Sequence, residues 1–100
     1  MTTTSTTTTF SREMGLTHAE FFRTLPAAMG GQAYQVSGRC ISVEDGDRRL
    51  TILLDPEGER RIALLRLPVT RVSFEFSRYT QQDIDAFMKR FERHFQRGGG

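Results

Sequence analysis

The clearest hydrophobic pattern lies in residues 71–79, where apolar and polar side chains alternate. The apolar phase consists of Val72, Phe74 and Phe76, and polar residues occupy positions 71, 73, 75 and 77. Because successive side chains of a strand point to opposite faces, this stretch predicts a strand with one buried face.

Three further stretches, rich in β-branched and aliphatic residues, predict strands at residues 33–43, 49–54 and 60–67. Gly38 marks a bulge or kink in the first of them. The connecting segments EDGD and DPEGE have the Asp-Gly and Pro-x-Gly composition of tight turns. Short turns join antiparallel neighbours, so the four strands are expected to form a meander.

An N-terminal helix is predicted by the segment LTHAEFFRTLPAAMGG. Thr17 and Glu20 have the spacing of a capping box, which satisfies two backbone N–H groups at a helix start. The helix is expected from His18 to Leu25. Pro26 then either kinks or stops it, with the following AAM able to add a turn before the glycine pair.

A C-terminal helix is predicted after Thr80, a good N-cap residue with Asp83 three positions later. An advance of about 100° per residue separates its apolar and basic side chains. The apolar stripe contains Ile84, Phe87, Met88, Phe91 and Phe95. The basic stripe contains Lys89, Arg90, Arg93 and Arg97. The three final glycines, residues 98–100, are expected to end the helix.

Together these elements predict an α+β fold, a four-stranded antiparallel sheet (meander) flanked by an N-terminal and a C-terminal helix in the order α-β-β-β-β-α. The C-terminal helix is expected on the face of the sheet that carries Phe74 and Phe76. The N-terminal helix either joins that face or covers the other. No strand–helix–strand unit is present, which argues against a parallel sheet.

The N-terminal segment has a different composition, because residues 2–9 are seven threonines and one serine. Without an apolar period, nothing offsets the entropy of ordering such a segment. We therefore expect a disordered leader at residues 1–14, a single domain at 15–97 and a flexible tail at 98–100. Met14 is a candidate alternative start.

Composition narrows the class of protein. With 37% hydrophobic and 26% charged residues, the 100-residue chain is typical of a globular domain. A single cysteine excludes an internal disulfide, and no apolar run approaches the ~18 residues of a membrane span. Neither a secretory signal nor a family motif is recognisable, so we expect a cytoplasmic protein without a cofactor.

No catalytic or metal site is predicted. The only candidates for a nucleophile and its base are Cys40, His18 and His94, and no spacing brings them together. A structural zinc site requires about four such ligands, more than the three that this chain contains. The sequence therefore favours a non-enzymatic role.

A candidate interface lies in RIALLRL, in which both phases of the predicted strand are apolar. Ile62 and Leu64 occupy one phase, and Ala63, Leu65 and Leu67 occupy the other. A strand in a sheet with one solvated face should alternate. Either the N-terminal helix covers the second face, or Ala63, Leu65 and Leu67 meet a protein partner or a second copy in a homodimer.

The alternative is a site for an anionic ligand, either nucleic acid or a phosphate or carboxylate metabolite. The chain has thirteen arginines and one lysine, and arginine is the better bidentate partner for phosphate and carboxylate groups. The candidate contacts are Arg39, Arg66 and Arg71 on the sheet, or the basic stripe of the last helix. The net charge of +2 is small, so nucleic acid is the less favoured partner.

Overall fold

The structure, a computed structural model, describes residues 7–98, with side chains described through residue 95. It is an α+β fold with six strands and two helices over the described residues. In chain order these are β1 (Thr7–Met14), α1 (His18–Met29), β2 (Gln35–Ser37), β3 (Cys40–Asp45), β4 (Arg48–Leu54), β5 (Gly58–Ile62), β6 (Leu65–Ser77) and α2 (Gln81–Gly98).

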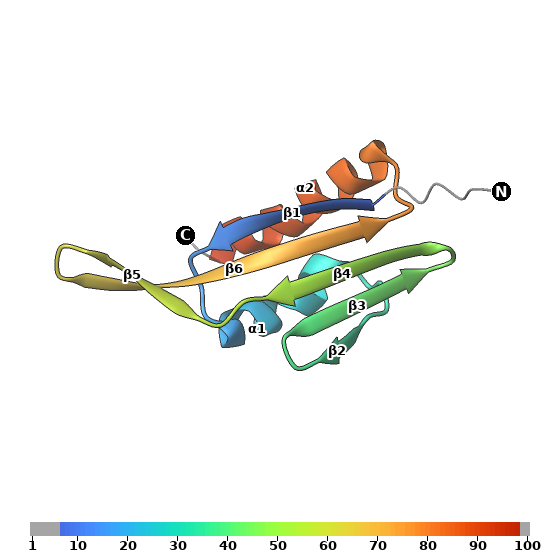
Figure 1. The fold of residues 1–100 in the computed structure, drawn as a ribbon. Coiled ribbons are helices and arrows are strands. Elements are labelled where there is room, and N and C mark those ends of the chain that lie inside the picture. Colours follow the sequence, from blue (N-terminus) through green and yellow to red (C-terminus); the bar gives the residue numbers. More distant parts are fainter. Residues whose placement is uncertain (1–6, 99–100) are drawn as a thin grey trace.

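The strands form one antiparallel sheet in the order β1-β6-β4-β3-β2 (Figure 1). The long strand β6 pairs with β1 and β4 along its C-terminal half, and with β5 along its N-terminal half. Residues 58–69, which are β5 and the start of β6, project past the rest of the sheet as a two-stranded ribbon. We call this segment the hairpin arm.

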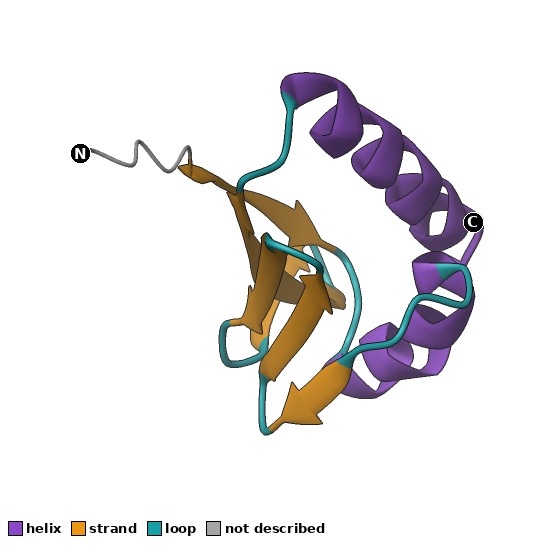
Figure 2. Cartoon of the chain, turned by 90° about the vertical axis from the view of Figure 1, so that its right-hand side faces the viewer, coloured by secondary structure: helices purple, strands orange, loops and turns teal. Residues whose placement is uncertain are grey.

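Both helices pack on the same face of the sheet, which leaves the other face without a helix (Figure 2). Aromatic side chains fill the space between the layers. The ring centroids of Phe21 and Phe95 lie 5.1 Å apart, and those of Phe74 and Phe91 lie 5.4 Å apart. The apolar side chains at residues 72, 74 and 76 therefore lie on the buried face of the sheet, as their alternation predicts. The N-terminal helix packs on this same face instead of covering the opposite face of the sheet.

The predicted helix starts are confirmed. In α1, Glu20 N donates to Thr17 Oγ1 at 3.1 Å and Thr17 N donates to Glu20 Oε1 at 2.9 Å, which completes the capping box. In α2, Asp83 N donates to Thr80 Oγ1 at 3.0 Å. The whole apolar stripe of α2 is buried: Ile84, Phe87, Met88, Phe91 and Phe95.

Pro26 does not end α1, which continues to Met29 and closes at Gly30 with a φ of 64°. Of the two outcomes left open at the proline, the additional turn is therefore the one that forms. The extra turn carries Ala28 and Met29 into the core. Phe22, in contrast, is only half-buried.

The expectation of a disordered leader is wrong for residues 7–14, which form β1. They pair with β6 along its whole C-terminal half, from Thr7 opposite Ser77 to Met14 opposite Thr70. This pairing supplies the backbone hydrogen bonds that a threonine-rich segment lacks on its own. Residues 1–6 lie outside the described part of the chain, as do residues 99 and 100 of the expected tail. Gly98 is the last residue of α2.

The four-stranded meander is also corrected, because two predicted strands each divide in two. The first divides at Gly38, whose φ is 61°, so that residues 35–37 and 40–45 form an antiparallel pair. The predicted strand at residues 60–67 reverses direction at Ala63 and Leu64, between β5 and β6. Ala63 has a φ of 56°, a conformation that residues other than glycine, asparagine and aspartate rarely adopt.

Candidate functional site

Of the six exposed large apolar side chains among the described residues, four lie on the hairpin arm. Leu64 at its tip is 99% exposed, and the neighbouring Leu65, Ile62 and Leu67 are 61%, 52% and 41% exposed. Ala63, also at the tip, is exposed. The three predicted interface residues, Ala63, Leu65 and Leu67, therefore lie together on one projecting segment.

The two faces of the hairpin arm differ in character. Leu65 pairs with Ile62 and Leu67 pairs with Arg60, so these side chains share one face. Arg66 pairs with Arg61 on the other. The arm is thus a ribbon with an apolar tip, one mainly aliphatic face and one face with two adjacent guanidinium groups.

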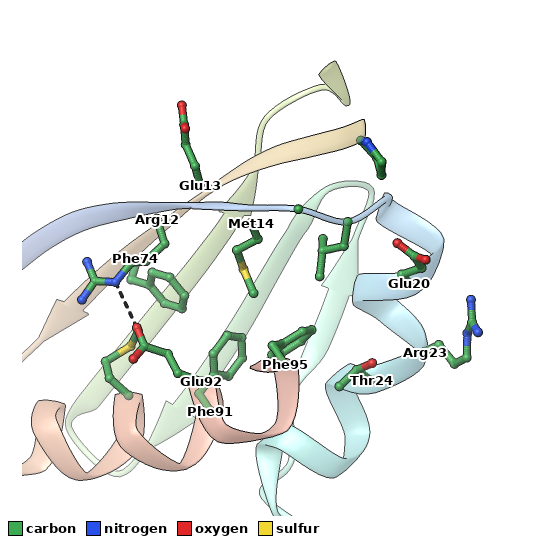
Figure 3. Close-up of a pocket in the computed structure, with 14 residues that line it drawn as sticks. Arg12, Glu13, Met14, Glu20, Arg23, Thr24, Phe74, Phe91, Glu92 and Phe95 are labelled. Atoms are coloured by element: carbon green, nitrogen blue, oxygen red, sulfur yellow. Dashed lines mark hydrogen bonds and ion pairs between the residues drawn. The ribbon is translucent and has the colours of Figure 1, made fainter. Parts of the chain in front are cut away.

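A groove of about 640 Å³ opens at the base of the arm, between β1, α1 and α2 (Figure 3). Its floor consists of apolar side chains, namely Met14, Leu16, Phe74, Met88, Phe91 and Phe95. Pro68, at the root of the arm, also lines it. The groove and the arm are therefore neighbours within one molecule.

Charged side chains surround the groove. Arg12 Nε donates to Glu92 Oε2 at 3.0 Å and so bridges β1 and α2 across its mouth (Figure 3). Glu13 accepts from Arg60 Nη2 at 2.8 Å, which ties β1 to the arm. Glu20 and Arg23 contribute one further charge of each sign from α1.

The candidate catalytic residues have separate partners. His18 Nε2 lies 2.8 Å from Asp55 O, and His18 N donates to Glu57 Oε2 at 2.8 Å, so this histidine holds the loop before the arm. His94 Nδ1 lies 3.0 Å from Arg90 O. Cys40 is a half-buried free thiol on β3. No hydrogen bond joins these three side chains.

Within residues 7–95, no group of three or more histidine, cysteine, aspartate or glutamate side chains could hold a metal ion. Neither of the two described helices is long and apolar enough to cross a membrane.

The three arginines proposed on the sheet do not form one cluster. Arg39 Nη1 donates to Leu54 O at 2.7 Å. Arg71 lies opposite Glu13 in the pairing of β6 with β1. Arg66, five residues before Arg71 on the same strand, points to the opposite face and lies on the hairpin arm.

The basic stripe of α2 remains at the surface. Lys89, Arg90 and Arg93 are exposed, on the side of the helix away from its buried stripe. Among the side chains that the structure describes, none of these three forms an ion pair. The guanidinium of Arg90 lies 5.8 Å from the centre of the Phe87 ring. The side chain of Arg97 lies outside the described residues.

A polar cluster that the sequence did not reveal joins the β3–β4 turn to the start of α2. Arg48 bonds to both Asp45 and Asp83, and its guanidinium lies 4.9 Å from the centre of the Tyr79 ring. The hydrogen bond to Asp45 raises the pKa of Arg48. Because every charge in this cluster has a partner within it, we assign it a structural role.

Sequence reasoning located the apolar surface but missed the groove. In the alternating pattern of the sequence, Leu64 falls on the opposite phase from Leu65 and Leu67, because the pattern does not reveal the turn at the tip; in the structure it is the most exposed of the large apolar residues described. The groove depends on β1, and Thr7–Met14 has only Phe10 and Met14 to signal a buried side.

No protein-family model matches this chain, and neither the curated proteins nor the solved structures contain a significant match to it.

Proposed function

We propose that this chain is a non-enzymatic self-association module whose contact surface is the hairpin arm. The observation that carries the proposal is the cluster of four exposed large aliphatic side chains on the projecting hairpin arm: Ile62, Leu64, Leu65 and Leu67. Exposed apolar residues that stand singly need no explanation, whereas a contiguous patch marks an interaction surface.

The two-stranded architecture of the hairpin arm supports this function. A two-stranded ribbon is at best marginally stable in water, because it has no third strand or helix to cover its apolar face. Fully burying one leucine or isoleucine side chain stabilises by about 1.5–3 kcal/mol. Burial of the tip against another protein surface would therefore both hold the ribbon together and supply binding free energy.

Sedimentation velocity over a range of protein concentrations tests the proposal. We expect the wild-type chain to associate and a Leu64→Asp/Leu65→Asp variant to remain monomeric. Val36→Asp is the matched control, because Val36 is 49% exposed on β2, at the edge of the sheet away from β6. A wild-type chain that stays monomeric at the highest concentration would contradict self-association. Equal association of the wild type and the arm variant would contradict the role of the arm.

A second candidate function is the binding of an anionic ligand by α2. The observation in its favour is the exposed row of Lys89, Arg90 and Arg93, without ion pairs among the described side chains. If the ligand is nucleic acid, the affinity for a fluorescent single-stranded oligonucleotide should fall steeply with salt, because bound counterions are released. Binding that is absent at low salt would rule out this function.

A further inference from the structure

We infer that the groove between β1, α1 and α2 receives the arm tip of a second copy, and that two copies exchange their tips reciprocally about a twofold axis. This inference rests on the proposed self-association and names the surface on which the tip docks. It follows from the chemistry of the groove, from its charge and from its position relative to the arm.

The groove has the properties of a receptor for aliphatic side chains. Its volume of about 640 Å³ lies within the usual range for pockets that bury a ligand. Its floor is made of phenylalanine, methionine and leucine side chains. Methionines such as Met14 and Met88 adapt their shape to an incoming group. The apolar tip of the arm, Ile62 to Leu65, presents side chains of this kind.

Charged side chains of the two surfaces can pair with each other. Residues 58–69 carry three arginines and one glutamate, and the groove is bordered by three glutamates and two arginines. Arg60 and Glu13 already bond to each other within one molecule, so neither counts towards a contact between molecules. Arg61 and Arg66 are exposed and form no ion pair among the described side chains. They can contact Glu20 and Glu92 of a partner, because these carboxylates already accept from Thr17 N and from Arg12 but have room for a further hydrogen bond.

A tip cannot enter the groove of its own chain. Pro68 lines the groove, and the strand then runs outward from Pro68 to the turn at Ala63 and Leu64. At about 3.3 Å per residue, the tip lies roughly 15 Å beyond this root. Only another molecule can therefore bring a tip to the groove.

Reciprocal exchange closes the assembly. In each molecule the arm begins beside the groove. When the arm of one molecule enters the groove of a second, the groove of the first therefore lies near the arm of the second. A twofold axis makes the two contacts identical, with the arms antiparallel across the axis. Such an isologous contact ends at a dimer, whereas a one-way contact that does not close would form a filament.

Cross-linking between single-cysteine variants of the full chain tests this arrangement. In a Cys40→Ser background, Leu64→Cys places a thiol at the tip and Thr24→Cys places one at the groove, which is lined by the half-buried Thr24 of α1. The two variants, one of them labelled with ¹⁵N, are mixed and treated with a short bismaleimide. Gln35→Cys, exposed on β2 at the far edge of the sheet, replaces Thr24→Cys in the control mixture.

We expect the mixture of tip and groove variants to give a cross-linked species with the mass of one labelled and one unlabelled chain. The control mixture should not give this species. A variant with both Leu64→Cys and Thr24→Cys should stop at a covalent dimer. A ladder of higher species would overturn the reciprocal exchange.

Failure of the inference can be told apart from failure of the proposed function. Dimers that cross-link only tip to tip, while the Leu64→Asp/Leu65→Asp variant is still monomeric, would overturn the groove as the docking surface and leave self-association through the arm intact. A wild-type chain that is monomeric throughout would overturn both.

Discussion

Arg48 and Asp83 join the sheet to the last helix: Arg48 Nη1 donates to Asp83 Oδ2 at 3.1 Å. Asp83 also caps α2 together with Thr80. Hydrogen bonding to the Thr80 side chain, then to its backbone, and the nearby Arg48 guanidinium lower the pKa of Asp83. The same carboxylate thus serves both the helix start and the contact between helix and sheet.

Stability should therefore depend on Asp83 in acid. A carboxyl group whose pKa is lower in the folded state stabilises fully above its unfolded pKa of about 3.9, and the contribution is lost as the pH falls through the folded pKa. We expect Asp83→Asn to be less stable than the wild type at pH 7 and the difference to shrink below about pH 4. Urea unfolding at both pH values measures this, and a difference that is the same at both would contradict it.

Tyr79 should limit stability in alkali. Burial raises its pKa, with its ring packed 5.1 Å from that of Phe76. A group whose folded pKa is raised contributes its full stability below the unfolded value, about 10 for tyrosine, and loses it as the pH rises through the folded pKa. Thermal unfolding from pH 8 to 11 should show a smaller alkaline loss in Tyr79→Phe than in the wild type. An alkaline loss of the same size in the two chains would contradict this role of Tyr79.

Replacement of Ala63 by glycine should stabilise the hairpin arm. The left-handed conformation at Ala63 costs an L-residue roughly 1–2 kcal/mol, which glycine avoids. We expect Ala63→Gly to slow amide hydrogen exchange in residues 58–67 by a factor that corresponds to about 1 kcal/mol. Gly46→Ala is the reverse control, because Gly46 has a φ of 64° in the β3–β4 turn. Faster exchange in Ala63→Gly would show that this turn is not strained.

Phe10 should anchor β1. Its ring centroid lies 5.5 Å from that of Phe74 and 5.8 Å from that of Phe76. Since Phe10 is only half-buried, we expect Phe10→Ala to cost about 2 kcal/mol of unfolding free energy, less than the 3–5 kcal/mol of a fully buried phenylalanine.

Thr9→Ala is the control for this strand, because Thr9 is exposed and points to the opposite face. Its effect should stay within about 0.5 kcal/mol. A chain that lacks residues 1–13 should lose the cooperative transition of the wild type in urea. Unchanged stability after this deletion would show that β1 is dispensable.

The predictable part of the fold is the part in which sequence periodicity and burial coincide. Phe74 and Phe76 alternate with polar residues, and Phe87 and Phe91 recur at helical spacing, so both patterns identify the core directly. Capping residues such as Thr17 gave the helix starts, because their hydrogen bonds are local.

The remaining elements depend on long-range contacts or on an unusual backbone. β1 forms because β6, far away in the sequence, offers it a partner edge, and no local pattern encodes that pairing. The hairpin arm was missed because Ala63 adopts a positive φ without being glycine, so RIALLRL has the composition of one continuous strand. The predicted arginine site placed Arg66 and Arg71 on two different strands, 60–67 and 71–79, whereas both lie on β6, five residues apart and so on opposite faces.

The pairing of β1 with β6 places Thr7 opposite Ser77 and so joins residues that are far apart along the chain. Contacts with such a large sequence separation raise the contact order, and they form only after the entropy of closing a long loop has been paid. β1 has no strand to pair with until β6 has left the ribosome. α1 and the β3–β4 hairpin precede β6 in the chain, so they can form during synthesis before β1 is paired into the sheet.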